Sequence, residues 1–301
     1  MFLFSCLVLT APFGGVGRAD EATAVPAGPD QPPLTRIDKA QYHLFRPTPQ
    51  AYLRELTPDR PDKTESPYTV DAGHFQLEMD LVSYTHDAER AGGVARRVEA
   101  WAIAPLNLKA GLCNQADLQV IVETWNEVET KARGPGLTLQ RHSHGFGNVT
   151  TRMKYNFWGN DGGPTAFGMI PFAKWPTSQD RLGNGNVEGG IVFPLAVELP
   201  RGFGMGLMTE FTCNRDDLGN GSHPEFVNSI TFSHDLVGRL GGYVEFFSAT
   251  SSEPDSDWVG TVDFGLTYGL TENLQLDTGV NVGVTKSADD LNLFFGLSCR
   301  Y

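Results

Sequence analysis

The sequence predicts an all-β protein, a single antiparallel transmembrane β-barrel of about 12 strands with short periplasmic turns and longer extracellular loops. Three observations predict it. The first residues are typical of an exported protein, residues 73–301 alternate between apolar and polar positions, and the connections alternate between short and long. The chain has 301 residues and a formal net charge of −13, which argues against a nucleic-acid partner because binding phosphates needs a basic surface.

The chain divides into three predicted regions. Residues 1–19 are predicted to be a signal peptide, because an apolar stretch over residues 1–16 precedes a cleavage expected near Ala19. Residues 20–72 form a Pro-rich periplasmic arm, which the composition predicts to be largely disordered. Residues 73–301 form the outer-membrane barrel. The sequence has no run of 18 apolar residues, so an ordinary transmembrane helix is excluded.

Period-two alternation gives each predicted strand one apolar and one polar face. Around residues 274–284, for example, Leu274, Leu276 and Val280 share one face, while Gln275 and Asp277 lie on the other. A tilted strand of about 10 residues crosses a bilayer. The predicted strands are roughly 74–85, 94–110, 117–128, 147–157, 165–175, 187–199, 202–213, 225–235, 239–249, 258–269, 273–285 and 290–301.

The connections predict which end of the barrel is which. Long, polar connections such as 86–93 and 129–145 are expected outside the cell, and tight ones such as 200–201 and 271–272 in the periplasm. Twelve strands then place both ends of the barrel chain on the periplasmic side. Residues 113, 213 and 299 are cysteines, an odd number without metal-type spacing, and they predict no disulfide framework.

Aromatic residues on the apolar faces gather near both ends of the strands, as the two interfaces of a membrane require. The predicted interface aromatics are Phe75, Phe157, Phe203, Tyr268 and Tyr301 at the short-turn ends and Trp175, Phe211, Phe226 and Trp258 at the long-loop ends. A soluble β-sandwich is the alternative fold, but it needs a second sheet to cover these apolar faces.

The polar faces carry both signs of charge and are predicted to line a lumen. The candidate residues are Gln76, Glu78, Asp80, Gln119, Glu123, Arg152, Lys154, Asn156, Glu210, Glu245, Asp263, Asp277, Asn281 and Arg300. Barrel closure predicts that Arg300 faces the lumen within salt-bridge reach of Glu78 or Asp277. Two interpretations stay open: the charges fill and fix the barrel, or they line a selective path. The arm is also able to plug a barrel of this size.

A resemblance to a known family rests on three segments. Residues 56–78 read LTPDRPDKTESPYTVDAGHFQLE and resemble the opening of the bacterial family described as "Putative MetA-pathway of phenol degradation". Residues 268–276, YGLTENLQL, and the pair KAGL (109–112) and DLQV (117–120) resemble its recurring short turns. The resemblance covers roughly residues 56–301. It implies an outer-membrane barrel that resembles a transporter, and it carries no residue-level mechanism.

The predicted function is passive passage of small solutes, with aromatic or hydrophobic compounds as candidates, through a barrel in the cell outer membrane. The expected partners are outer-membrane lipid and lipopolysaccharide, the solute, and the barrel-assembly machinery, which would recognise the C-terminal strand closed by Tyr301. No nucleic acid, cofactor, metal or catalytic residue is predicted. The alternative of a different class is a structural or adhesive surface barrel without transport activity.

An enzymatic function is disfavoured by the spacing of the candidate residues. Ser233 and His234 are adjacent on a predicted strand and would point to opposite faces, so they could not readily share a proton. His142 and Ser143 are placed in a predicted loop without a recognisable orienting residue. His142 and His144 supply two ligands, which is too few for a metal site. The carboxylates at 216–217 and 289–290 are interpreted as solvated charges of outer loops, and the alternative is that they meet divalent ions that bridge lipopolysaccharide.

Overall fold

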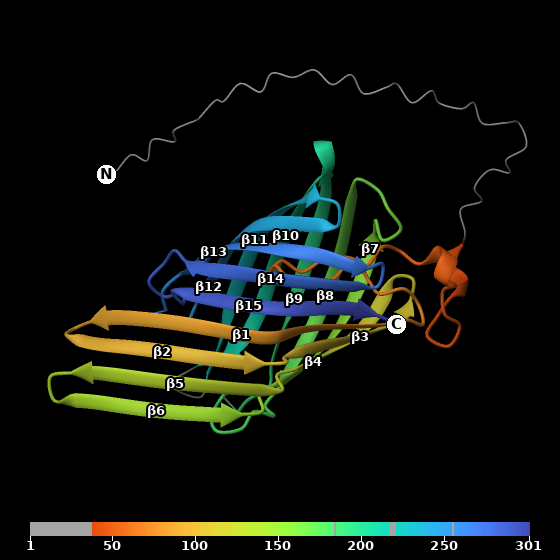
Figure 1. Ribbon diagram of the computed structural model, residues 1–301. Coiled ribbons are helices and arrows are strands. Elements are labelled where there is room, and N and C mark those ends of the chain that lie inside the picture. Colours follow the sequence, from red (N-terminus) through yellow and green to blue (C-terminus); the bar gives the residue numbers. More distant parts are fainter. Residues whose placement is uncertain (1–37, 184, 217–220, 255) are drawn as a thin grey trace, which may run out of the picture. The chain divides into compact units, whose positions relative to one another are not determined.

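The computed structural model describes residues 38–301 except 184, 217–220 and 255. The predicted signal peptide and the arm up to residue 37 lie outside the described residues. Fifteen strands form one antiparallel sheet, and pairing of its first strand with its last closes the sheet into a barrel (Figure 1). Over the described part of the chain, no helix is long and apolar enough to cross a membrane.

The fifteen strands of the described residues correspond to twelve antiparallel barrel strands, called staves below, as predicted. Three of the twelve are each interrupted once and therefore count as two strands. The strands are β1 (Phe75–Ala91), β2 (Val94–Ile103), β3 (Leu106–Cys113), β4 (Ala116–Val122), β5 (Trp125–Gly134), β6 (Leu137–Gly145), β7 (Val149–Trp158), β8 (Thr165–Trp175), β9 (Glu188–Leu199), β10 (Phe203–Arg215), β11 (Ser222–Val237), β12 (Leu240–Ser251), β13 (Val259–Thr271), β14 (Leu274–Gly283) and β15 (Leu291–Arg300). Three short 3₁₀ helices are η1 (Lys39–Gln41), η2 (Gln50–Tyr52) and η3 (Pro200–Gly202).

The interrupted staves are β2/β3, β4/β5 and β6/β7. Between β2 and β3, Ala104 adopts a φ of 54° and Pro105 has no N–H to donate, so the ladder cannot continue across this point. At this level β1 changes partner: its first residues pair with β3, and residues from Val82 onward pair with β2. The outer half of β1 continues with β2, β5 and β6 as a four-stranded extension of the sheet (Figure 1). Among the described strands, β6 has β5 as its only ladder partner.

Two of the predicted outer loops are wrong. Residues 86–91 belong to β1, and residues 129–145 form most of a hairpin of β5 and β6. The connections are instead the tight turns at Gly92-Gly93, both with positive φ, and Pro135-Gly136. The prediction failed because residues 86–91 and 129–145 carry polar residues on both faces, so they lack the apolar face that alternation detects.

The exterior of the barrel is apolar. The nine predicted interface aromatics are all exposed, from 41% for Phe226 to 73% for Tyr301, and they stand near the strand ends. Trp101 also lies outside, because its ring packs at 4.6 Å from Tyr84 and the ladder pairs Tyr84 with the outward Leu293. It therefore does not narrow the lumen.

Candidate functional site: the lumen and the arm inside it

The arm passes through the interior of the barrel. Asp59 bonds side chains of β3 and β7, Arg60 bonds carboxylates of β1 and β14, and Lys63 bonds a carboxylate of β13. Glu65 and Thr64 add contacts to β10, β11 and β12, so the contacted strands lie around most of the circumference of the wall. A segment this short reaches all of them only from within, so residues 59–66 occupy the lumen.

Asp59 is the centre of the first buried charge cluster. Its carboxylate oxygens lie 2.5 Å from Nζ of Lys109 and 2.5 Å from Nζ of Lys154, and Lys109 is also paired with Glu78. The Asp59, Lys109 and Lys154 side chains are 7%, 2% and 1% exposed. The same carboxylate accepts hydrogen bonds from N and Oγ of Ser66, at 3.0 and 2.7 Å. Buried charges are tolerated when they are paired and hydrogen-bonded in this way.

A second arm carboxylate bonds β7 two residues further toward the outer end. Arg152 donates two parallel hydrogen bonds to Glu65, at 2.5 and 2.6 Å, and its Nε donates to Oε1 of Gln119 at 3.0 Å. The bidentate geometry fixes orientation as well as charge. Arm and wall are therefore matched in position, not merely in net charge.

Arg60 bonds the wall at β1 and β14. Its guanidinium lies 2.6 Å from Asp277 on β14 and 2.7 Å from Asp80 on β1, and it stands 5.6 Å from the ring centre of Phe294 on β15. Since β1, β14 and β15 form the closing seam, Arg60 bonds strands on both sides of it.

Lys63 and Thr64 complete the ring of contacts on β11, β12 and β13. Both backbone N–H groups donate to the carboxylate of Glu245, at 3.0 and 2.7 Å, and Oγ1 of Thr64 lies 2.6 Å from Oγ of Ser229. Nζ of Lys63 lies 3.1 Å from Asp263. These contacts tie residues 63 and 64 to three further strands of the wall.

The base of the arm is fixed at the periplasmic end. Lys39 Nζ lies 2.9 Å from the carboxylate of Asp161, in the turn between β7 and β8, and Asn114 donates to the same carboxylate at 2.6 Å. Partial burial alone would raise the pKa of Asp161, but the hydrogen bonds from Lys39 and Asn114 hold it below its ordinary value. This contribution to stability is present above the ordinary carboxyl pKa and is lost as the pH falls through the lowered one.

Arg300 faces the lumen, but the predicted partners are wrong. Its guanidinium donates to Oδ1 of Asn273 at 2.7 Å and to the backbone oxygen of Arg54 at 2.7 Å, and it lies 3.6 Å from Asp71. The two carboxylates predicted for it are already paired, Glu78 with a lysine of β3 and Asp277 with an arginine of the arm. The prediction failed because it placed water, not a second segment of the chain, inside the barrel.

The prediction of a largely disordered arm is wrong for residues 38–72. This part of the arm is rich in Pro and polar residues, so it has no apolar face to bury against a sheet. It is ordered because its polar groups find partners on the polar inner wall instead. Val70 N donates to Asp117 at 3.0 Å and Asn156 donates to the backbone oxygen of Pro67 at 2.9 Å.

The inner wall is not polar throughout. The inward faces of β8 to β12 carry an apolar cluster of four buried residues, Ile170, Val192, Met208 and Val227, with Phe172, Phe247 and Ala249 packed against it. Met208 touches the arm, since the backbone N–H of Glu65 points to its sulfur at 3.4 Å. Sequence analysis did not identify this cluster. The signal was present, because β8 and β9 carry apolar residues on both faces, the inward one included.

A polar cavity lies on the periplasmic side of the arm. It has a volume of about 530 Å³ and is lined by the base of the arm and by the periplasmic ends of β11 to β15, including Arg54, Arg239, Glu272, Gln275 and Arg300. The lumen therefore consists of a periplasmic cavity, an arm that fills the middle, and an apolar cluster beside the arm.

Comparison with known proteins assigns the family. The family model described as "Putative MetA-pathway of phenol degradation" matches residues 58–301, which is most of the chain. The chain belongs to this family. No curated protein matches it at a significant level.

Solved structures that resemble this member of the phenol-degradation family are outer-membrane barrels. The COG4313 outer membrane channel from Pseudomonas putida F1 has a TM-score of 0.52 at 12% identity, and the match covers 82% of this chain and 100% of that one. The NanC porin has a TM-score of 0.44 at 9% identity, with 72% and 98% covered. The CymD monoaromatic hydrocarbon channel has a TM-score of 0.39 at 9% identity, with 75% and 87% covered. The first likeness shows the fold of an outer-membrane channel.

Thirteen of the fourteen candidate lumen residues lie on strands, on the same face as residues that bond the arm. On β4, β10 and β14, for example, the arm contacts Asp117, Met208 and Asp277, and period two places Gln119, Glu210 and Asn281 beside them. Glu123 lies in the break between β4 and β5, where its carboxylate accepts the backbone N–H of Asn148 at 2.9 Å. Whether these residues act on a solute is a proposal taken up below.

The candidate catalytic pairs are not assembled. His234 stacks on Phe203 at 4.2 Å on the outer face, while Ser233 points to the other side of β11. His142 and His144 lie on one face of β6, with ring centres 5.3 Å apart, and His142 bonds Glu127 at 2.9 Å. Ser143 is buried on the opposite face. Channels and porins, which the fold resembles, are typically not enzymes.

Gly111 provides a test of how closely the arm fits. A Cβ at this position would lie 2.1 Å from the backbone oxygen of Asp71, so Gly111→Ala is expected to push the arm away from β3. We expect a cost of about 1–3 kcal/mol and faster proteolysis within residues 54–72, measured by limited digestion in detergent. Gly269→Ala is the matched control, because its Cβ would meet only ordinary contacts at 3.8 Å or more. Equal digestion of both variants would contradict a close contact between the arm and β3 at Gly111.

Proposed function

We propose that this barrel mediates passive passage of small apolar or aromatic solutes across the outer membrane, and that the arm controls the opening. One observation carries the proposal: the only polar segment that blocks the lumen among the described residues is held beside an inward-facing apolar cluster. A wall that merely needed filling could be packed by its own side chains, without a separate segment held by charge pairs.

The inward-facing apolar cluster favours the passage of apolar solutes. Binding sites for small molecules are lined mainly by apolar and aromatic side chains, with a few polar groups that fix orientation. The cluster on β8 to β12 supplies such a surface, with Phe172 and Phe247 at its edge and the charged arm residue Lys63 4.6 Å from the ring centre of Phe247. A shift of the arm would expose these residues to the lumen. The periplasmic cavity then receives what has passed.

The family and the fold support the same class. The family description names phenol degradation, and the fold is that of the COG4313 outer membrane channel. In this proposal the fourteen candidate residues seat the arm and line the path around it, lipid and lipopolysaccharide contact the aromatic exterior, and the assembly machinery recognises β15 and Tyr301. These assignments extend beyond what the fold alone shows.

Uptake measurements test the proposal. Cells that express the protein are expected to take up a labelled monoaromatic solute several-fold faster than cells without it, provided the lipopolysaccharide leaflet is intact. Arabinose, a hydrophilic solute of similar size, serves as the control and is expected to show little difference. Met208→Asp places a charge in the apolar cluster and is expected to abolish the difference for the aromatic solute. Equal uptake with and without the protein would contradict a transport function.

A surface scaffold remains the second candidate, because one observation favours it. The four-stranded extension formed by β1, β2, β5 and β6 projects past the points at which the staves are interrupted. Most residues of β6 are exposed. Exposed edge strands are able to pair with other chains. If the extension is adhesive, deleting residues 129–145 should abolish surface adhesion and leave solute uptake unchanged. If it has no adhesive role, the deletion should leave adhesion unchanged as well.

A further inference from the structure

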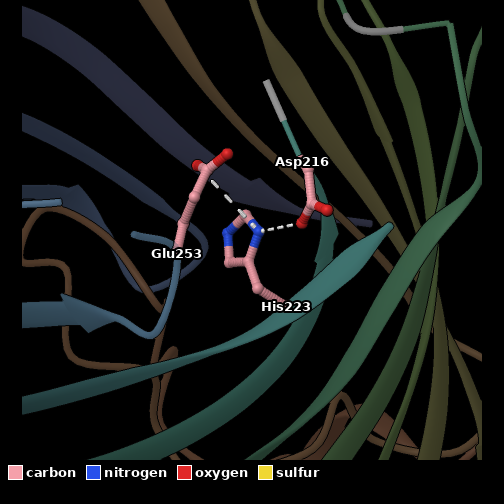
Figure 2. A group of neighbouring side chains, drawn as sticks. All are labelled: Asp216, His223 and Glu253. Carbon is pink, nitrogen blue, oxygen red and sulfur yellow. Dashed lines mark hydrogen bonds and ion pairs between the residues drawn. The ribbon is translucent and has the colours of Figure 1, made fainter. Parts of the chain in front are cut away.

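The extracellular mouth brings one imidazole and two carboxylates together at the tips of neighbouring hairpins. Asp216 follows β10, His223 lies near the start of β11, and Glu253 follows β12. Figure 2 shows the imidazole between the two carboxylates. Nδ1 of His223 lies 2.9 Å from Oδ1 of Asp216 and 4.0 Å from Oε2 of Glu253, and the three ligand atoms all lie within 4.8 Å of one another.

These side chains are partly withdrawn from solvent. The His223 side chain is 11% exposed, and those of Asp216 and Glu253 are 25% and 22% exposed. Asp216, interpreted from the sequence as a solvated loop charge, is partly exposed and is paired with His223, while Asp217 lies outside the described residues. Sequence reasoning missed the group because its members are separated by 7 and 30 positions in the chain, and strand pairing brings them together.

The backbone holds the ligand atoms in place. Asp216 N donates to the backbone oxygen of Gly221 at 3.3 Å, and a Cβ on Gly221 would lie 2.1 Å from Oδ2 of Asp216. A side chain at this position would therefore displace the carboxylate from its present place. Ser252 N donates to the backbone oxygen of Pro224 at 3.0 Å, which joins the segment carrying Glu253 to the strand carrying the histidine.

The donor set selects a class of ion. Zinc and related divalent ions accept imidazole nitrogen and carboxylate oxygen at about 2.0–2.2 Å, so ligand atoms of a tetrahedral site lie roughly 3.3 Å apart. Of the present separations, the 2.9 Å between His223 and Asp216 would lengthen slightly and the 4.0 Å between His223 and Glu253 would shorten. Calcium prefers six to eight oxygen ligands, and magnesium an octahedral oxygen shell, so both fit less well. Two carboxylates also neutralise a divalent cation.

We propose that His223, Asp216 and Glu253 bind one zinc-class divalent ion at the extracellular mouth, with the remaining coordination position open to water. The ion would join the β10–β11 connection to the β12–β13 connection. It is independent of the proposed transport function, since none of the three residues contacts the arm in the contacts described above.

Zinc binding to the full-length barrel in detergent micelles tests the proposal. Competition with a chromophoric chelator is expected to give one Zn²⁺ per chain, and Co²⁺ is expected to give visible absorption bands from the same site. His223→Gln and Glu253→Gln should each weaken binding at least about tenfold, because ligand loss costs no less than loss of an outer-shell partner. Zn²⁺ should raise the melting temperature of the unsubstituted protein and not of these variants.

The matched control is His142→Gln, which removes another imidazole bonded to a carboxylate but leaves the mouth intact. It should bind Zn²⁺ with unchanged stoichiometry and affinity. Gly221→Ala should weaken binding without removing a ligand atom. Absence of stoichiometric binding, or binding that His223→Gln leaves unchanged, would overturn the proposal and leave an imidazole–carboxylate ion pair only.

Discussion

Replacing Asp59 with alanine is expected to release the arm from the lumen and to raise the single-channel conductance several-fold. The substitution leaves the ammonium groups of Lys109 and Lys154 buried without their shared partner. Breaking a buried ion pair by removing one member costs about 3–5 kcal/mol. The wall is held by a continuous backbone ladder, whereas the arm is held by side-chain contacts, so the loss should fall mainly on the seating of the arm.

Planar-bilayer recording gives the conductance, and digestion of the arm by trypsin reports its release. Glu55→Ala is the matched control, because it removes an exposed carboxylate of the same arm. It should leave both readings at the level of the unsubstituted protein. If Asp59→Ala stays as closed and as resistant as Glu55→Ala, the charge cluster does not hold the arm.

A disulfide between the arm and β11 is expected to close the barrel reversibly. The hydroxyl oxygens of Thr64 and Ser229 lie 2.6 Å apart, close to the separation that two bonded sulfurs need. In a background with Cys113, Cys213 and Cys299 replaced by serine, oxidised Thr64→Cys/Ser229→Cys should lose aromatic solute uptake almost completely. Dithiothreitol should restore it, because reduction frees the arm to move.

The two single cysteine variants are the controls and should respond to neither oxidation nor reduction. Gel mobility under non-reducing conditions confirms that the bond has formed. Full uptake by the locked protein would show that solute passes without movement of the arm. In that case the barrel would still be a channel, but the arm would not control it.

The sequence predicts the barrel well because the membrane imposes a simple rule on each strand. Strands such as β13 and β14 meet an apolar solvent on one side, so their outward residues are apolar and their inward ones polar, and alternation finds both. The same rule fails for β5 and β6, which carry polar residues on both faces. Their residues, from Trp125 to Gly145, look like a loop to any method that needs an apolar face.

The contents of the lumen are harder to predict, because they depend on contacts between distant parts of the chain. Asp59 and Lys154 are 95 positions apart, and Lys63 and Asp263 are far more distant still. A polar inner face indicates that polar partners exist without indicating whether they are water or protein. The sequence holds one signal of an internal partner: the arm carries the basic residues Arg60 and Lys63, and the predicted inner faces carry unpaired carboxylates. The structure pairs these basic residues with carboxylates of β14 and β13.

Charge pairs that radiate from a central segment also affect how the cylinder responds to force. A barrel held only by the hydrogen bonds between its strands resists stretching around its circumference, but it deforms when it is compressed across its diameter. Here Asp277 on β14 and Lys154 on β7 lie well apart around the ring of strands, and they are joined through the adjacent arm residues Arg60 and Asp59. We therefore expect a barrel emptied of this segment to deform more easily across its width.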